Sequence, residues 1–475
     1  MVRGRIEIRT SAWPFGVAAL ILFALCLYRM WPGIAAYDTI KQYEQALAGQ
    51  YDDWHPPIMA RLWALTLAAG ARGTAPMLLI QSGLYWLGFG LFAGGLARSG
   101  ARWAAGATLL VALSPIMLNW LPVIVKDTQM IAAVVAAIGI VAWYRLPGLR
   151  LPWWAIGLVA LFLSYAALVR ANAVFAVVPL ALMLAGWCGI GRWWLRVIVL
   201  GVATLLVIGI SDPINHRLLD ADRSGVATTL PLFDLAGIAH DAPLAAPPGL
   251  EPRQWAQAER LGCYTPFYWD PFGDAKRCGA LGDEIVAQDD GQPPIMRVWI
   301  ATIAAHPIAY AEHRLAHLDA TLRVMTPNDE KSAAAPSKSD PNPHALGGPE
   351  TPTSTALKAV AAMLERTPMG SPAVWLVFLC GIGWTLLGTA AQPARDLGLA
   401  LALSGVLMTA SFAVVSIASD LRYHLWLIEA SGLAAVALAG CRGIPRRRLA
   451  WTMSGVAVAI LASALARAHG IALRY

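Results

Sequence analysis

The chain has 475 residues, of which 57% are hydrophobic and 14% are charged, and its formal net charge at pH 7 is +7. A soluble core of this size does not need so many long apolar runs, so the composition places the chain among polytopic membrane proteins. The positive charge does not indicate nucleic-acid binding, because the arginines cluster at the ends of apolar runs, as in the cytoplasmic loops of membrane proteins.

The first apolar run follows a basic N-terminus. Arg3, Arg5 and Arg9 precede the run from Trp13 to Trp31. This run is too long for a typical cleaved signal peptide, and no small-residue cleavage site follows it. We therefore expect a retained first membrane helix with its N-terminus in the cytoplasm.

About eleven apolar runs in all predict spanning helices. They lie near residues 14–31, 77–97, 104–122, 129–144, 153–169, 172–187, 195–211, 372–391, 397–417, 423–441 and 449–466. The run from Pro56 to Ala71 is short and carries Arg61, so it predicts an interfacial or re-entrant helix that begins at the proline pair. With this count the arginine-rich loops share one side of the membrane, as the positive-inside rule requires.

The predicted fold is an all-α polytopic membrane protein with a mainly helical or irregular extracytoplasmic domain. We expect three parts: residues 1–211 as an N-terminal transmembrane module with a first extracytoplasmic loop at 32–57, residues 212–371 as the extracytoplasmic domain, and residues 372–475 as C-terminal transmembrane helices. Within the domain, the sequence predicts helices over 212–225, 253–261 and 297–322 and an aromatic loop over 266–278. Residues 328–353, rich in Pro, Ser, Ala and Lys, predict a mobile loop.

Two of the 6 cysteines, Cys263 and Cys278, share this polar domain. In an oxidising compartment they can pair, and closing a loop of about 15 residues contributes roughly 3 kcal/mol. Two unrelated thiols are the alternative.

The first extracytoplasmic loop carries the most unusual polar residues. Asp38 opens a short amphipathic helix that Gly49 can end. The carboxylate of Asp38 can be the N-cap of that helix, or it can act at the membrane surface as a general base or a metal ligand. These roles are compatible.

Asp52, Asp53 and His55 follow shortly afterwards, directly ahead of the proline pair. Two adjacent carboxylates can bind a divalent cation, although adjacent acids in a loop are usually only solvated. His55, placed just before a helix start, can donate a hydrogen bond to a phosphate or can be an ordinary interfacial histidine.

Three basic residues fall on the same predicted face as this loop, namely Lys126, Arg170 and Arg422. Fixed cations there can hold a phosphate group. Each has a simpler alternative, since Lys126 can pair with Asp127, Arg422 can pair with Asp420, and Arg170 can extend from a helix end towards the interface.

Two further patterns bear on metal-dependent and nucleotide-dependent chemistry. His313 and His317 have the i, i+4 spacing that can chelate zinc, but no third ligand is evident, so we favour an interfacial helix. A P-loop, a Rossmann glycine pattern and a Ser/His/Asp triad are absent from the sequence, which disfavours ATP-driven chemistry.

Several of these motifs together resemble the GT-C superfamily of membrane glycosyltransferases, which use polyprenyl-phosphate sugars and include bacterial lipid A aminoarabinose transferases and relatives of protein O-mannosyltransferases. A first membrane helix, an acid opening a short helix, an acidic turn with glycine, and a Pro-Pro pair that begins an aromatic helix look like the first extracytoplasmic loop of that group. Residues 169–172 (Val-Arg-Ala-Asn), residues 419–423 (Ser-Asp-Leu-Arg-Tyr) and the Lys126-Asp127 pair are similar to further stretches of such enzymes. Two positions depart from the pattern: Thr39 stands where many relatives have a second acid, and His55 stands where the aminoarabinose enzymes have a lysine.

The resemblance implies a GT-C-like bundle and an inverting transfer. Asp38 would take the proton of the acceptor hydroxyl as that hydroxyl attacks the anomeric carbon, and polyprenyl phosphate would leave. The donor phosphate would be held by His55, Lys126, Arg170 and Arg422, and the other site candidates are Tyr37, Asp52, Asp53, Asp127, Asp420 and Tyr423.

The partners implied are a polyprenyl-phosphate sugar donor, an envelope glycolipid, polysaccharide or protein acceptor, and the lipid bilayer. The expected location is a bacterial inner membrane, with the active site on the periplasmic face. No cofactor is implied apart from a divalent cation as an alternative at Asp52 and Asp53. A transporter or flippase of lipid-linked or anionic solutes, or a structural subunit of an envelope-synthesis complex, are the competing hypotheses.

Overall fold

The structure is a computed structural model that describes residues 12–186, 190–242, 252–287, 294–325 and 335–469. The described chain is almost wholly helical. Its strands are β1 (Tyr51–Asp52) and β2 (Ala221–Asp222), which pair in parallel. The expectation of an all-helical membrane protein is confirmed, whereas the basic residues before Trp13 lie outside the described residues.

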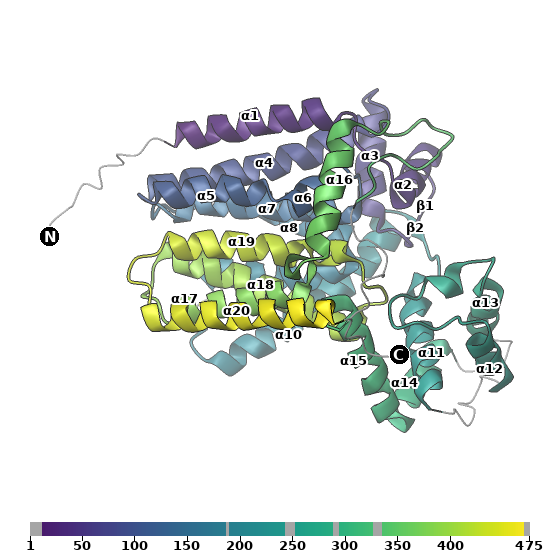
Figure 1. Cartoon of the computed structure of the whole chain (residues 1–475). Helices are drawn as coiled ribbons and strands as arrows, with labels where there is room; N and C mark the ends of the chain where they lie inside the picture. The colour runs from purple at the N-terminus through teal and green to yellow at the C-terminus, as the bar shows by residue number, and fades with distance from the viewer. Residues whose placement is uncertain (1–11, 187–189, 243–251, 288–293, 326–334, 470–475) are drawn as a thin grey trace.

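One set of helices lies side by side as a bundle (Figure 1). It consists of α1 (Trp13–Met30), α4 (Ala75–Arg98), α5 (Arg102–Ala112), α6 (Pro115–Trp120), α7 (Lys126–Arg145), α8 (Trp153–Val169), α9 (Val174–Leu184), α10 (Trp193–Pro213), α17 (Pro372–Leu387), α18 (Pro393–Val415), α19 (Leu425–Ala439) and α20 (Arg446–Ala468). By length and composition, 6 helices of the described residues can cross a membrane, those that begin at Trp13, Ala75, Lys126, Trp193, Pro393 and Arg446. The count of about eleven spans stays a prediction.

Prolines set several helix boundaries. The expected run over 104–122 is divided at Ser114 into α5 and α6, because Pro115 cannot donate to a continuing helix. The short run expected over Pro56 to Ala71 forms α3 (Pro57–Ala68), which begins at the second proline of the pair. Its 12 residues rise only about 18 Å, too short for a hydrocarbon core of about 30 Å. This length fits the interfacial or re-entrant helix expected from the sequence.

The centre of the bundle is the contact between α4 and α7. Gly88 on α4 and Gly139 on α7 pack backbone against backbone, and a Cβ on either one would overlap the other helix. Small residues allow such close approach between helices. The result is a nearly fully buried α7, whose first residue, Lys126, is held rigidly at one end of the bundle.

That end of the bundle is covered by α2 (Tyr37–Ala48), α3 and the helices of the long middle segment (Figure 1). The latter are α11 (Thr229–Asp241), α12 (Pro252–Arg260), α13 (Gly279–Ala287), α14 (Ile295–Ala305), α15 (Pro307–Leu322) and α16 (Pro352–Glu365). A second apolar core, with Leu235, Trp255 and Phe272 among its members, holds α11 to α15 together, whereas α16 packs against α6. The limits of the three predicted parts stay a prediction.

Two expectations for the middle segment are corrected. The single helix expected over 297–322 is two helices, α14 and α15, because Pro307 breaks the chain after His306. The helix expected over 212–225 is the end of α10 and a short turn over Ile214–Leu218, followed by β2. The helix expected at 253–261 is present as α12.

The segment from Ala335 to Gly348 lies against the first extracytoplasmic loop. Asp340 N–H donates to the Ala35 carbonyl at 2.8 Å, and Gly348 N–H donates to the Gly33 carbonyl at 2.9 Å. Ala335 N–H donates to the Asn119 side chain at 2.9 Å. Residues 328–334 lie outside the described part, and mobility over 328–353 stays a prediction that these contacts disfavour for 335–348.

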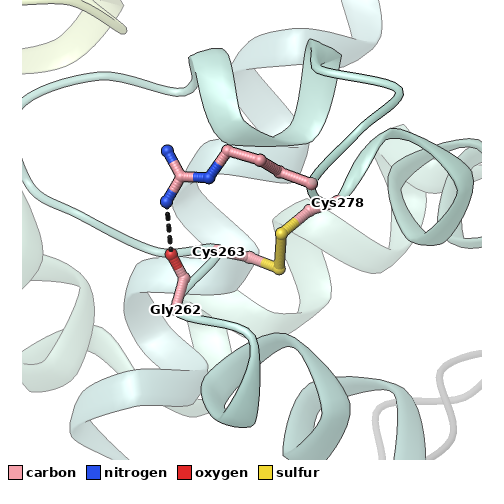
Figure 2. The surroundings of a disulfide bond; sticks show 4 residues. Gly262, Cys263 and Cys278 are labelled. Carbon is pink, nitrogen blue, oxygen red and sulfur yellow. Dashed lines mark hydrogen bonds between the residues drawn. A yellow bond between two sulfur atoms is a disulfide. The ribbon is translucent and has the colours of Figure 1, made fainter.

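The expected disulfide is present between Cys263 and Cys278 (Figure 2). It joins the turn after α12 to the start of α13, and both sulfur-bearing residues are buried in the second apolar core. Beside it, Arg277 donates to the Gly262 carbonyl at 3.5 Å.

Replacing both cysteines, Cys263→Ser with Cys278→Ser, is expected to cost the domain about 3 kcal/mol, because the unfolded chain regains the freedom of the loop. Limited proteolysis of the membrane-embedded protein measures this as faster cleavage within 252–287. The double variant Cys26→Ser with Cys380→Ser, which removes two free thiols of the bundle, is the control and should leave that cleavage rate unchanged. Equal rates for all three proteins would mean that the bond does not stabilise the domain.

Candidate active site

A short backbone clamp brings the first loop and the start of α7 together. Ile34 N–H donates to the Pro122 carbonyl at 2.9 Å, and Ile124 N–H donates to the Ile34 carbonyl at 3.1 Å. Thr39 completes the clamp, since its hydroxyl accepts from Ala36 N–H at 3.0 Å and donates to the Ile124 carbonyl at 2.7 Å. The clamp holds the first turn of α2 beside the first turn of α7.

Asp38 lies in that first turn but does not cap the helix. The N-cap of α2 is Ala36, so the capping role considered from the sequence is not the one that the structure gives to Asp38. Its carboxylate instead lies 3.5 Å from the guanidinium of Arg422, and only 16% of the side chain is exposed.

The surroundings keep this carboxylate ionised. Burial raises the pKa of Asp38, but the positive charges of Lys126 and Arg422, with a smaller contribution from Arg170, lower it by more, so the net shift is downwards. His55 also lies close enough to affect this pKa, and it lowers the pKa when its own ring is protonated. Four of the predicted site residues thus converge on Asp38 from remote parts of the chain.

Arg422 occupies a short 3₁₀ turn, Leu421–His424, ahead of α19. Its guanidinium lies 3.3 Å from Asp420 as well as 3.5 Å from Asp38. Burial lowers the pKa of Arg422, while Tyr423, Asp38 and Asp420 raise it above its ordinary value, so the group stays charged. Arg422 therefore pairs with Asp420, as one alternative from the sequence predicted, and with Asp38 as well.

Arg170 is the buried partner of Asp127. The two side chains form an ion pair and are 7% and 2% exposed. Arg170 also donates to the Asn172 side chain at 2.7 Å, and its guanidinium lies over the ring of Tyr423 at 4.3 Å. Arg170 does not extend freely to the interface, and its charge is already balanced, so it orients Tyr423 and the adjoining Arg422.

Lys126 makes no ion pair with a described residue. Asp127, which the sequence offered as its partner, turns to Arg170 instead. In the described part of the chain no carboxylate lies within ion-pair distance of the Lys126 amine, and the residue is half-buried. Its positive charge is directed at the region of Asp38, where an anionic ligand can meet it.

His55 lies in the same region but is not a cation at neutral pH. It is 5% exposed, and neither ring nitrogen has a hydrogen-bond partner among the described residues. Burial lowers its pKa to about 4, assisted by the charge of Lys126. A neutral imidazole there can donate one N–H to a ligand.

Three other predicted residues stand apart from this cluster. Asp52 accepts from the Trp54 N–H at 3.0 Å, and Asp53 accepts from the Ser224 N–H and hydroxyl, each at 2.6 Å. Tyr37, the first residue of α2, is 61% exposed. Across the described ranges no three His, Cys, Asp or Glu side chains gather as metal ligands, and a cation at Asp52 and Asp53 stays a prediction.

The two histidines of α15 that could chelate zinc by their spacing are hydrogen-bonded to other protein groups in the structure. His313 lies between Tyr264, at 2.8 Å, and Asp234, at 3.0 Å, while His317 bonds the Pro266 carbonyl at 2.6 Å. These rings join α15 to α11 and to the aromatic loop, which is a structural role. The backbone clamp is the site feature that sequence reasoning missed. Thr39 was noted only as a departure from the GT-C pattern, because a threonine in a helix carries no signal for the long-range hydrogen bond that it makes to Ile124.

The buried His55 predicts acid sensitivity. Because its pKa is about 4 in the folded state and 6.5 ordinarily, the unfolded chain binds more protons between these values. The free energy of unfolding should fall as the pH falls through this interval, by up to about 3 kcal/mol from this residue.

His55→Asn should therefore show a shallower loss of thermal stability between pH 7 and pH 5 than the unchanged protein, in the same detergent. His344→Asn, which removes a partly exposed histidine, is the control and should follow the parent curve. Parallel curves for His55→Asn and its parent would contradict the buried neutral state of His55.

Comparison with known proteins gives little. No family model matches the chain, and no curated protein sequence matches it. Among solved structures, the archaeal oligosaccharyltransferase AglB from Archaeoglobus fulgidus, in complex with an inhibitory peptide and a dolichol-phosphate, is similar with 14% identity and a TM-score of 0.36. The match covers 96% of this chain and 56% of that one, so the chain spans little more than half of that protein's length. A likeness of this degree supports neither a shared fold nor a shared activity.

Proposed function

We propose that this chain is a membrane glycosyltransferase that moves a sugar from a polyprenyl-phosphate donor to a hydroxyl acceptor at the extracytoplasmic face. The observation that carries the proposal is an ionised carboxylate, Asp38, beside two cations, Lys126 and Arg422, at one end of an apolar helical bundle. The GT-C-like motifs of the sequence fall on these same residues, which adds support.

The reaction assigns one role to the carboxylate. The acceptor oxygen forms a bond to the anomeric carbon, its proton passes to Asp38, and the bond from that carbon to the phosphate oxygen breaks. Because attack and departure occur on opposite faces, the sugar is transferred with inversion. General bases of this kind contribute about 10²- to 10⁴-fold to the rate.

The cations have the second role. The departing polyprenyl phosphate carries negative charge that Lys126 and Arg422 can stabilise, and the His55 N–H can add a neutral hydrogen bond. Bound phosphate would also offset the positive charges that lower the pKa of Asp38. The base would then become stronger when the donor is in place.

The location of the cluster agrees with a lipid-borne donor. Among the described residues, the arginines of the loops predicted to be cytoplasmic lie at the ends of α4 and α7 and at the starts of α10, α18 and α20, away from the cluster. By the positive-inside rule, this distribution supports an extracytoplasmic position for the cluster. A phosphate whose lipid tail lies in the bilayer can reach the interfacial helices α2 and α3 without leaving the membrane.

Purified protein in vesicles that contain a synthetic polyprenyl-phosphate sugar tests the proposal. In the presence of an envelope glycolipid extract, a transferase releases free polyprenyl phosphate and adds the mass of one sugar to the acceptor. A transporter or flippase would move the donor between leaflets and leave it intact. Mass spectrometry of envelope glycans from a deletion strain, with and without the restored gene, then identifies the sugar class.

A further inference from the structure

The opposite end of the bundle contains two adjoining cavities. The larger, about 840 Å³, lies between α9 and α10 on one side and α17 and α18 on the other. The smaller, about 430 Å³, continues from it along the ends of α7 and α9. Both have volumes in the range of pockets that hold small ligands. They share Arg145, Met183 and Asp396 as lining residues.

Their polar lining is strongly basic. Arg145, Arg196 and Arg395 reach the larger cavity from the end of α7 and the first turns of α10 and α18, and Arg150 reaches the smaller one. Asp396 is the acid that lines both cavities, and it pairs with Arg395 at 3.0 Å. The four arginines outnumber this single acid, so the two cavities carry a net positive charge that can bind an anion.

The remaining walls are apolar and open towards the surroundings of the bundle. Leu399 and Val406 of α18 and Trp384 of α17 line the larger cavity, and Trp384 is 53% exposed. Facing them is α10, in which no described residue is buried and whose main neighbour is α9. In Figure 1 this helix runs along the outer edge of the bundle. An apolar helix that is separated from its neighbours in this way must be covered by hydrocarbon.

From the basic lining and the open apolar walls together, we infer that these cavities bind an anionic phospholipid of the cytoplasmic leaflet. Its phosphate lies among Arg145, Arg196 and Arg395, and its acyl chains fill the space between α10 and the α17–α18 pair. Basic pockets between helices on the cytoplasmic side recognise anionic head groups in this manner. The inference does not depend on the proposed reaction, which occurs at the other end of the bundle.

The test measures lipid retention. The protein is reconstituted in nanodiscs of mixed phosphatidylglycerol and phosphatidylcholine, extracted in mild detergent, and weighed by native mass spectrometry. The parent protein should retain phosphatidylglycerol selectively. The triple variant Arg145→Gln, Arg196→Gln, Arg395→Gln should lose about fivefold in affinity for each arginine.

A matched control separates the site from general surface charge. The triple variant Arg102→Gln, Arg446→Gln, Arg447→Gln removes the same charge from exposed residues at the same end of the bundle, outside both cavities. It should retain phosphatidylglycerol like the parent. Equal loss in both triple variants would overturn the inference.

Two further experiments, a variant that narrows the cavity and a competition with inorganic phosphate, distinguish a lipid from a free anion. Leu403→Trp narrows the larger cavity without changing any charge, and it should also reduce retention; it decides the question if the arginine variant does not fold. Inorganic phosphate should not displace the lipid from the parent protein. Displacement by inorganic phosphate would mean that the site recognises the phosphate group alone. Full retention by Leu403→Trp would mean that the lipid binds outside the larger cavity, and either result would overturn the inference.

Discussion

Asp38→Asn should abolish nearly all sugar transfer, lowering turnover by about 10²- to 10⁴-fold, because the amide cannot take the proton of the acceptor hydroxyl. The substitution keeps the size of the side chain and the helix that carries it. It also removes a negative charge that lies 3.5 Å from Arg422, so the binding of the anionic donor should hold or improve. A loss of kcat with an unchanged or lower KM is therefore the expected pattern.

The assay is release of polyprenyl phosphate in the vesicles described above, with abundance matched by size-exclusion chromatography. Glu44→Gln is the control, since Glu44 lies on the same helix as Asp38 and its carboxylate pairs with the exposed Lys41 at 3.0 Å. Its activity should stay within a few-fold of the parent. If Asp38→Asn retains full turnover, another group is the base and the proposed mechanism is wrong.

Breaking the Arg170–Asp127 pair should produce the largest loss of stability. Asp127→Asn leaves a buried guanidinium without its counter-charge, and Arg170→Met leaves a buried carboxylate alone. Removing one partner of a buried ion pair typically costs about 3–5 kcal/mol. Replacing both, with Asp127→Leu and Arg170→Met, should recover most of that loss because no uncompensated charge remains.

Thermal unfolding in one detergent measures all three variants. The exposed pair Lys41–Glu44, at 3.0 Å, provides the control: Lys41→Gln should change stability by less than about 1 kcal/mol. The double variant should still be impaired in sugar transfer, because Tyr423 loses the guanidinium that lies over its ring. A double variant that is as unstable as the single ones would show that the pair is not the origin of the effect.

The helical layout was largely predictable from the sequence, because apolar runs and prolines act locally. The run at Pro57 became a helix of 12 residues, as short as expected for a helix that does not span the membrane. Pro115 and Pro307 each broke a run that hydrophobicity alone made continuous. The break at Pro307 was missed only because the apolar pattern continues past it. A proline rule applied strictly would have found it.

Partner choice at the site was less predictable. The convergence of Asp38, Lys126 and Arg422 depends on the Ile34–Val123 bridge and on Thr39, which are contacts across long stretches of sequence. The expected helix over 129–144 left Lys126 and Asp127 in a loop, where they could pair. The structure starts α7 at Lys126, and adjacent residues in a helix point to different sides. Only the fold could show that Arg170 is the partner of Asp127.

The charged residues at the site, Asp38, Lys126, Arg170 and Arg422, are synthesised at different times. The chain is made and inserted from its N-terminus, so Asp38 and Lys126 can meet early, and Arg170 can neutralise Asp127 once α8 is in place. Arg422 arrives only when the last pair of helices, α19 and α20, follows it into the membrane. During synthesis the carboxylate therefore lacks one of its two principal counter-charges. In the proposed mechanism, the site for the donor phosphate is then complete only after the final helices are inserted.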